Sequence, residues 1–215
     1  MDRAVIRGLD LTLRPGELTA VVGPNGCGKT TLLKIIAGVY EPSGGAVLLE
    51  GRPLREYSQG DYRDNVYIWG VSSVIHPLTV RENVAICRLS DSGDHGTLAS
   101  ALSDAGAEDI VRGLPQGTET MLTRVLEDGQ QLSWGESLRI IIARALYARA
   151  EIMLIDEPAL GLDRQAVQGL VALLKRLAKN RIVVLASHDP EIVSMADHVV
   201  ELAEGAQAAL QTARN

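Results

Sequence analysis

Cysteine is scarce in this sequence, basic residues are in the minority, and apolar stretches are short. Cys27 and Cys87 are its two cysteines, and their separation matches no metal-site spacing, which favours a reducing, cytosolic compartment. The 27 Asp and Glu outnumber the 21 Lys and Arg, for a net charge of −6, whereas a nucleic-acid surface usually carries clustered Lys and Arg. No uninterrupted apolar stretch approaches the ~20 residues that span a bilayer. We therefore expect neither a nucleic-acid partner nor a membrane-spanning segment within this sequence.

What is present is enough apolar material for a sizeable core. The chain has 215 residues, of which 46% are hydrophobic, and this length suits one domain or one domain that carries a subdomain. The final segment, residues 204–215, has neither strand alternation nor a clear apolar face, so no regular structure is expected there.

Short runs of Val, Ile and Leu alternate with longer segments of helical periodicity. The runs IMLI and IVVLA have almost no polar interruption, which predicts parallel strands covered by helices on both faces. Strands are expected at Leu18–Val22, Ala46–Leu49, Val66–Ile68, Ile152–Ile155 and Ile182–Ala186, and helices at Lys29–Ala37, Glu136–Arg149, Arg164–Ala178 and Glu191–Ala196. The alternation predicts an α/β fold.

The strand pattern is absent between about residues 70 and 133. This region offers three short helical pieces, VRENVAI, TLASALSDA and AEDIVRGL, separated by Gly, Pro and Asp. We expect a helical subdomain of about residues 70–139, inserted into a core of about residues 1–69 and 140–215.

The stretch GPNGCGKTT, residues 23–31, lies between a predicted strand and a predicted helix. It contains G-x-x-x-x-G-K-[ST], whose backbone N–H groups form an anion cradle completed by the positive end of the following helix. Lys29 is expected to reach the terminal phosphates, and Thr30 to ligate Mg²⁺. The alternative is an ordinary strand–helix turn, but four fixed positions match by chance on the order of one time in a hundred. The candidate nucleotide-binding residues are Gly23, Pro24, Asn25, Gly26, Cys27, Gly28, Lys29, Thr30 and Thr31.

Two further strand ends carry candidate chemistry. Asp156 and Glu157 end the predicted strand in IMLIDEP, where a parallel sheet presents its ligands. Asp156 is a candidate Mg²⁺ ligand, and Glu157 could polarise an attacking water; the alternative is an acidic pair that faces solvent. His188 follows the run IVVLAS and would lie near the nucleotide, although a lone histidine is more often structural. The candidate catalytic residues are therefore Lys29, Glu157 and His188.

Together these motifs resemble the ATP-binding-cassette (ABC) ATPases over nearly the whole chain. GPNGCGKT is similar to the family's Walker A, IMLIDEP to its Walker B with the adjacent catalytic glutamate, and LGLD, residues 160–163, to its D-loop. His188 stands in the place of the switch histidine. LSWGE, residues 132–136, stands where the family carries LSGGQ, and LPQGTETML upstream looks most like exporter-type cassettes.

The resemblance implies a P-loop core with a mainly parallel sheet, an inserted helical subdomain and an N-terminal antiparallel β portion. It also implies binding and hydrolysis of ATP with Mg²⁺, which powers transport across a membrane. Two cassettes, as a homodimer or a heterodimer, would enclose two ATP molecules, with Ser133 and Gly135 of one closing over the γ-phosphate held by the other. A transmembrane subunit or domain would place the cassette at the cytoplasmic face of the cell membrane.

The sequence S-x-x-E at residues 133–136 has a second interpretation. It is also a capping box, in which Ser133 and Glu136 satisfy each other's backbone N–H groups at a helix start. The two interpretations are compatible.

Three departures from the family pattern modify these expectations. Trp134 replaces the first signature glycine, which predicts a heterodimer with two unequal ATP sites. Gly70 stands at the position of the Q-loop glutamine, which predicts slow turnover that Gly70→Gln would raise. No aromatic residue precedes Tyr40, whereas the family stacks adenine on one in its first strand; we favour a fragment that lacks this strand.

Two other function classes stay open. One is a nucleotide-binding regulatory cassette that scarcely hydrolyses ATP, which Trp134 and Gly70 would favour. The other is a cassette that acts on DNA or ribosomes, which the acidic balance disfavours.

Overall fold

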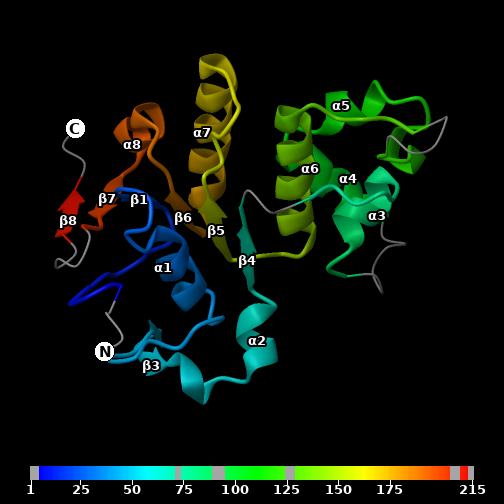
Figure 1. Ribbon diagram of the computed structural model, residues 1–215. Coiled ribbons are helices and arrows are strands. Elements are labelled where there is room, and N and C mark those ends of the chain that lie inside the picture. The colour runs from blue at the N-terminus through cyan, green and yellow to red at the C-terminus, as the bar shows by residue number, and fades with distance from the viewer. Residues whose placement is uncertain (1–4, 71–73, 89–94, 124–128, 204–208, 213–215) are drawn as a thin grey trace. The chain divides into compact units, whose positions relative to one another are not determined.

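The computed structural model describes residues 5–70, 74–88, 95–123, 129–203 and 209–212 (Figure 1). The chain divides into two compact units, one of Met1–Val71 with Glu151–Asn215 and one of Ser72–Ala150. The expected subdomain ended near residue 139, whereas the second unit includes the whole of helix α6 (Trp134–Tyr147).

The first unit is built on a six-stranded sheet in the order β4-β5-β6-β1-β7-β8. The first five of these strands are parallel, and β8 pairs antiparallel with β7. Their bounds are β1 Leu18–Val22, β4 Val66–Trp69, β5 Ile152–Asp156, β6 Ile182–Ala186, β7 His198–Glu201 and β8 Ala209–Thr212. Strands β2 (Leu48–Leu49) and β3 (Arg52–Pro53) form a separate antiparallel pair. The predicted fold class is confirmed.

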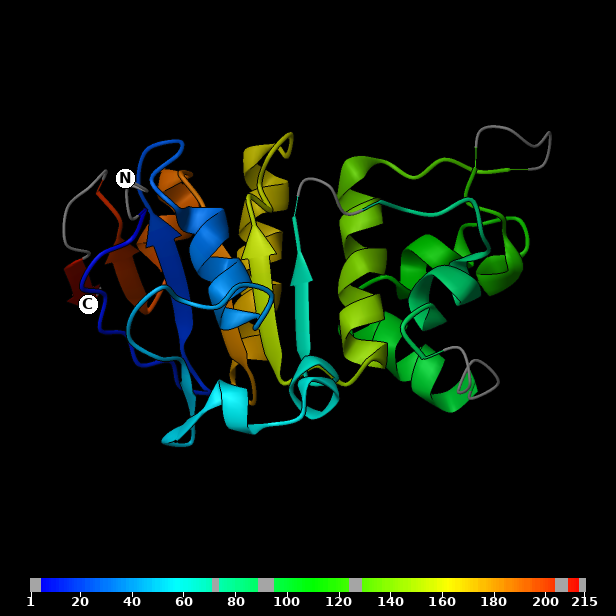
Figure 2. The same ribbon diagram turned by 60° about the horizontal axis from the view of Figure 1, so that its bottom comes forward.

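Helices cover both faces of the sheet (Figure 2). Helix α1 (Lys29–Ile36) covers one face, and α7 (Arg164–Ala178) and α8 (Pro190–Met195) cover the other. Because successive side chains of a strand point to opposite faces, Val21, Leu154 and Val184 form a buried cluster with Leu33 of α1. The remaining helical segments of this unit are η1 (Leu54–Glu56) and α2 (Gln59–Arg63).

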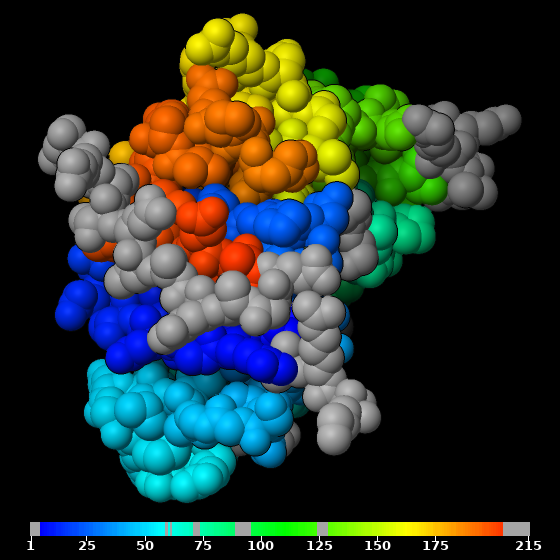
Figure 3. Space-filling model, turned by 60° about the vertical axis from the view of Figure 1, so that its left-hand side comes forward, coloured from blue at the N-terminus to red at the C-terminus, as the bar shows by residue number. Residues whose placement is uncertain are grey.

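Residues 5–13, the first that the structure describes, pack on this core without forming a regular strand. Figure 3 shows them in dark blue, between the cyan β2–β3 region and the orange C-terminal elements. Their partly buried side chains against the core cluster are Ile6, Leu9, Leu11 and Leu13. Residues 5–13 therefore contribute apolar burial to the unit that holds β1 and α1.

The second unit is helical in its described residues. It contains α3 (Val80–Ala85), α4 (His95–Asp104), α5 (Glu108–Arg112), η3 (Gly117–Glu119) and α6, and the first three coincide with the helical pieces expected there. The buried guanidinium of Arg144 in α6 donates to the backbone oxygen of Asn83 at 2.7 Å and to its Oδ1 at 3.2 Å. Asn83 lies in α3 and is itself fully buried. These buried bonds therefore link α3 to α6.

The expectation of no regular structure in residues 204–215 is wrong at Ala209–Thr212, which forms β8. This strand pairs Gln211 with Val199 and Leu210 with Val200, so backbone hydrogen bonds define it rather than a side-chain pattern. The rest of that segment lies outside the described residues. Strand β2 is shorter than expected, and the short run HVVE that forms β7 was not predicted.

Tyr62 ties α2 to the end of α1. Its hydroxyl donates to the carbonyl oxygen of Ile36 at 2.5 Å, and burial raises the pKa of Tyr62 from 10.0 to about 12. The folded state therefore keeps the phenol proton to a higher pH than the unfolded chain does. The protonated phenol contributes its full stability below pH 10, and this contribution is lost as the pH rises toward 12.

We expect Tyr62→Phe to isolate this effect. Near neutral pH the variant should be less stable than the wild type by about 1 kcal/mol, because one hydrogen bond is lost. In alkaline buffer, between the two pKa values, the difference in free energy of unfolding should shrink or reverse. Urea unfolding of both proteins at the two pH values measures it, and a difference that stays constant would contradict the buried phenol.

Candidate functional site

The loop that joins β1 to α1 is held open by glycines. Gly23, Gly26 and Gly28 have φ of 145°, 83° and 111°, a region that side-chain-bearing residues rarely adopt. Gly28 is the N-cap of α1, and no described side chain caps this helix end. The backbone N–H groups of the first helical turn therefore remain available to an external anion.

The Lys29 side chain folds back over this loop. Its Nζ donates to the carbonyl oxygen of Gly23 at 2.8 Å and to that of Pro24 at 3.4 Å. The side chain is only 8% exposed, and Nζ lies 3.9 Å from Oε1 of Glu157. The fold thus fixes one buried positive charge beside the first turn of α1.

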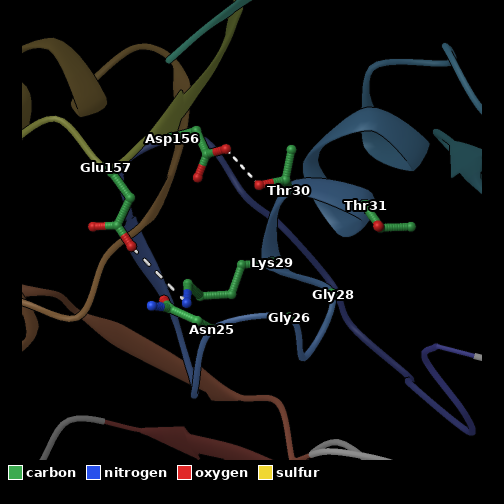
Figure 4. Close-up of a pocket in the computed structure, with 8 residues that line it drawn as sticks. All are labelled: Asn25, Gly26, Gly28, Lys29, Thr30, Thr31, Asp156 and Glu157. Carbon is green, nitrogen blue, oxygen red and sulfur yellow. Dashed lines mark hydrogen bonds and ion pairs between the residues drawn. The ribbon is translucent and has the colours of Figure 1, made fainter. Parts of the chain in front are cut away.

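Thr30 links the start of α1 to the carboxyl end of β5. Its hydroxyl donates to Oδ2 of Asp156 at 2.5 Å (Figure 4). A hydroxyl oxygen and a carboxylate oxygen are hard donors of the kind that Mg²⁺ prefers. The two residues fit a site for this ion.

Glu157 stands between the lysine and a histidine. Its φ of 51° turns the chain sharply after β5, while its N–H donates to the Ala186 carbonyl oxygen at 2.8 Å. Its Oε2 lies 2.9 Å from Nδ1 of His188, which is 67% exposed.

The β1–α1 loop, the start of α1 and the two carboxylates line one pocket of about 250 Å³, and His188 lies outside this lining. Figure 4 shows that residues of the β1–α1 loop and of α1 line one side of the pocket, and that residues at the end of β5 line the other. The lining residues are Asn25, Gly26, Gly28, Lys29, Thr30, Thr31, Asp156 and Glu157. The pocket therefore combines helix N–H groups, one ammonium group, two hydroxyls, one side-chain amide and two carboxylates.

Three expected residues of the loop lie outside the lining. Gly23 and Pro24 contribute the carbonyl oxygens that hold Lys29. The Cys27 side chain is 2% exposed and belongs to the apolar core cluster beneath the loop, so only its backbone can face a ligand.

Ser133 and Gly135 belong to the second unit, at the start of α6. Ser133 Oγ accepts from the Glu136 N–H at 3.3 Å, and Glu136 Oε2 accepts from the Ser133 N–H at 2.8 Å. The predicted capping box is confirmed.

The comparisons with known proteins decide the family. Residues 6–160 match the family model of the ABC transporters. The chain belongs to the ABC transporter family.

Its relatives within the family include proteins named as flippases and as peptide transporters. It is 34% identical to an ATP-dependent lipid A-core flippase of Chromobacterium violaceum, over 95% of this chain and 34% of the flippase. It is 36% identical to antigen peptide transporter 2 of Homo sapiens, over 95% of this chain and 29% of the transporter. This ABC chain therefore spans about a third or less of the length of the curated relatives it matches.

A solved structure gives the same family. A bacterial Atm1-family ABC exporter with ATP bound superposes with a TM-score of 0.83 at 28% identity, over 97% of this chain and 36% of the exporter. No helix among the described residues has the length and hydropathy to cross a membrane.

Two features of this ABC chain were not foreseen from the sequence. The Trp134 side chain at the first position of α6 buries its indole nitrogen, which has no hydrogen-bond partner among the described residues. Gly70 lies against Asp156: a Cβ atom added to Gly70 would be 2.8 Å from Asp156 Cβ. The sequence carried no signal for this contact, which bears on the expectation that Gly70→Gln would raise turnover.

Proposed function

We propose that this chain is the nucleotide-binding domain of an ABC transporter, in which it binds and hydrolyses ATP to power transport across a membrane. The observation that carries this proposal is the convergence of Lys29, Thr30, Asp156 and Glu157 on one pocket at the start of α1. Membership of the family supports the use of ATP.

The triphosphate would bind across the loop and the first turn of α1. The N–H groups from Gly26 to Thr31 would donate to phosphate oxygens, and the positive end of the helix favours their charge. Lys29 would exchange its carbonyl partners for β- and γ-phosphate oxygens, because charge-assisted hydrogen bonds are about twice as strong as neutral ones.

Thr30 and Asp156 would hold Mg²⁺, which neutralises phosphate charge when bound. Their present hydrogen bond of 2.5 Å keeps both oxygens in place without the ion. Mg²⁺ typically takes one or two protein ligands and completes its sphere with phosphate and water, so this pair is a sufficient protein contribution.

Glu157 is the proposed general base. Its carboxylate would accept a proton from the attacking water and orient that water toward the γ-phosphate. His188 would position the carboxylate through the contact between its Nδ1 and Oε2. Lys29, 3.9 Å from Oε1, would hold the opposite side of the same group while it contacts phosphate.

The partners are proposed from the family and from the names of the relatives. A second cassette would complete each ATP site, with Ser133 and Gly135 of one chain facing the nucleotide of the other. Transmembrane segments, in a longer form of this chain or in a separate subunit, would carry the substrate, which places the cassette at the cytoplasmic face of the membrane. The matched exporters and flippases favour an export-type system.

A nucleotide-binding switch that scarcely hydrolyses ATP is the second candidate function. Trp134 and Gly70 favour it, because both replace residues that the family uses around the nucleotide. The intact set of Lys29, Asp156 and Glu157 favours hydrolysis. A cassette acting on nucleic acid or ribosomes gains no support from the acidic composition.

The substitution Glu157→Gln separates hydrolysis from switching. It keeps the shape of the side chain but removes the base, so phosphate release should fall by about 10²–10⁴-fold while MgATP still binds. The control is Glu56→Gln, at a glutamate that pairs with Arg52 and does not line the pocket. It should leave the rate of phosphate release unchanged. A phosphate-release assay in which wild type and Glu157→Gln are equally slow would support the switch instead.

Trp134 predicts unequal ATP sites in the assembled transporter. An indole in place of a glycine should hinder closure over the nucleotide of the partner chain, so dimers of this chain alone should hydrolyse slowly. Trp134→Gly should raise their rate in the same assay. Brisk hydrolysis by wild-type homodimers, with both sites equivalent, would rule out this role for Trp134.

A further inference from the structure

Gly70 follows β4 at the point where the sheet presents Asp156. The parallel register pairs Trp69 of β4 with Ile155 of β5, so the next positions, Gly70 and Asp156, adjoin at the carboxyl ends of the two strands. Both residues belong to the first compact unit. The juxtaposition is therefore set by the sheet itself.

A side chain on residue 70 would collide with Asp156. An ideal Cβ atom on Gly70 would lie 2.8 Å from Asp156 Cβ and 3.3 Å from the Asp156 carbonyl oxygen. Non-bonded carbon atoms normally lie about 3.5–4.0 Å apart, so a side chain on residue 70 fits only if one of the two residues shifts. The φ of Gly70 lies outside the left-handed range, so its backbone conformation does not require glycine, whereas the close approach does.

The contact involves the Cβ and backbone atoms of Asp156, which cannot move without shifting the whole residue. A Cβ atom on residue 70 would press on the Cβ and the backbone of Asp156, not on the free end of its carboxylate. Moving Asp156 Cβ carries the carboxylate with it, and its Oδ2 is the acceptor of the 2.5 Å bond from Thr30.

We propose that Gly70 is a positioning residue for the metal site: by having no side chain, it sets the place of the Asp156 carboxylate opposite the Thr30 hydroxyl. This inference rests on the proposed function for its consequence, Mg²⁺-dependent binding of ATP. It reverses the expectation from the sequence, because Gly70→Gln should displace Asp156 and weaken the site.

The consequence is tested by calorimetry of ATP binding with Mg²⁺ and with EDTA. The variant is Gly70→Ala, and its control is Gly44→Ala, a glycine that also lacks left-handed φ and has open space around its Cβ position. Gly70→Ala should reduce the gain in affinity that Mg²⁺ brings by about 10–100-fold, the usual cost of disturbing a ligand's support. Metal-free binding should stay unchanged, and Gly44→Ala should match the wild type.

A Gly70→Ala variant with the full Mg²⁺-dependent gain would overturn the proposal. A wild type that binds no MgATP would instead contradict the proposed function. The contact at Gly70 is then tested without nucleotide, by melting temperatures. Gly70→Ala should lower the melting temperature of the wild type but not of Asp156→Gly, which lacks the opposing Cβ atom. Equal losses in both backgrounds would overturn the proposal, and a Gly70→Ala protein that fails to fold while Gly44→Ala folds would support it.

Discussion

The hydrogen bond from the Thr30 hydroxyl to the Asp156 carboxylate, 2.5 Å long, joins the two parts of the chain on which the site depends. Thr30 is in the first turn of α1, and Asp156 ends β5, far away in sequence. The bond holds the loop at residues 23–28 and the start of α1 against the carboxyl edge of the parallel sheet. Lys29 and Glu157 are the immediate neighbours of these two residues, so the same junction also fixes the distance between the ammonium group and the second carboxylate.

The fold makes this junction possible because parallel strands direct their carboxyl ends to one edge. Strands β1, β5 and β6 are neighbours or near neighbours in the sheet, and they end in the loop at residues 23–28, in Asp156 and Glu157, and in Ser187 and His188. Buried Val, Leu and Ile side chains keep the strands in register, while α1 packs on one face. Apolar packing therefore supplies the precision that the polar groups at the edge require.

The sequence predicted these features unevenly, for physical reasons. The glycine-rich loop between β1 and α1, the strand ending in Asp156 and the capping box at Ser133 depend on local residue types, and each appears where its pattern placed it. Strand β8 was missed because its pairing with β7 is a backbone interaction that leaves no alternation in the sequence. The contact of Gly70 with Asp156 and the burial of the Cys27 side chain were missed because each depends on a segment that is brought close only by folding.

The central claim is that the loop and the first turn of α1 bind a triphosphate whose charge Lys29 offsets. Calorimetry with MgATP on Lys29→Ala and on the matched variant Lys34→Ala tests this most directly, because Lys34 lies on the same helix and faces Tyr40. Loss of the Lys29 charge should weaken binding by about 10–100-fold, the cost of a hydrogen bond to a charged group, while Lys34→Ala should bind as the wild type does. Equal affinities for all three proteins would contradict the account.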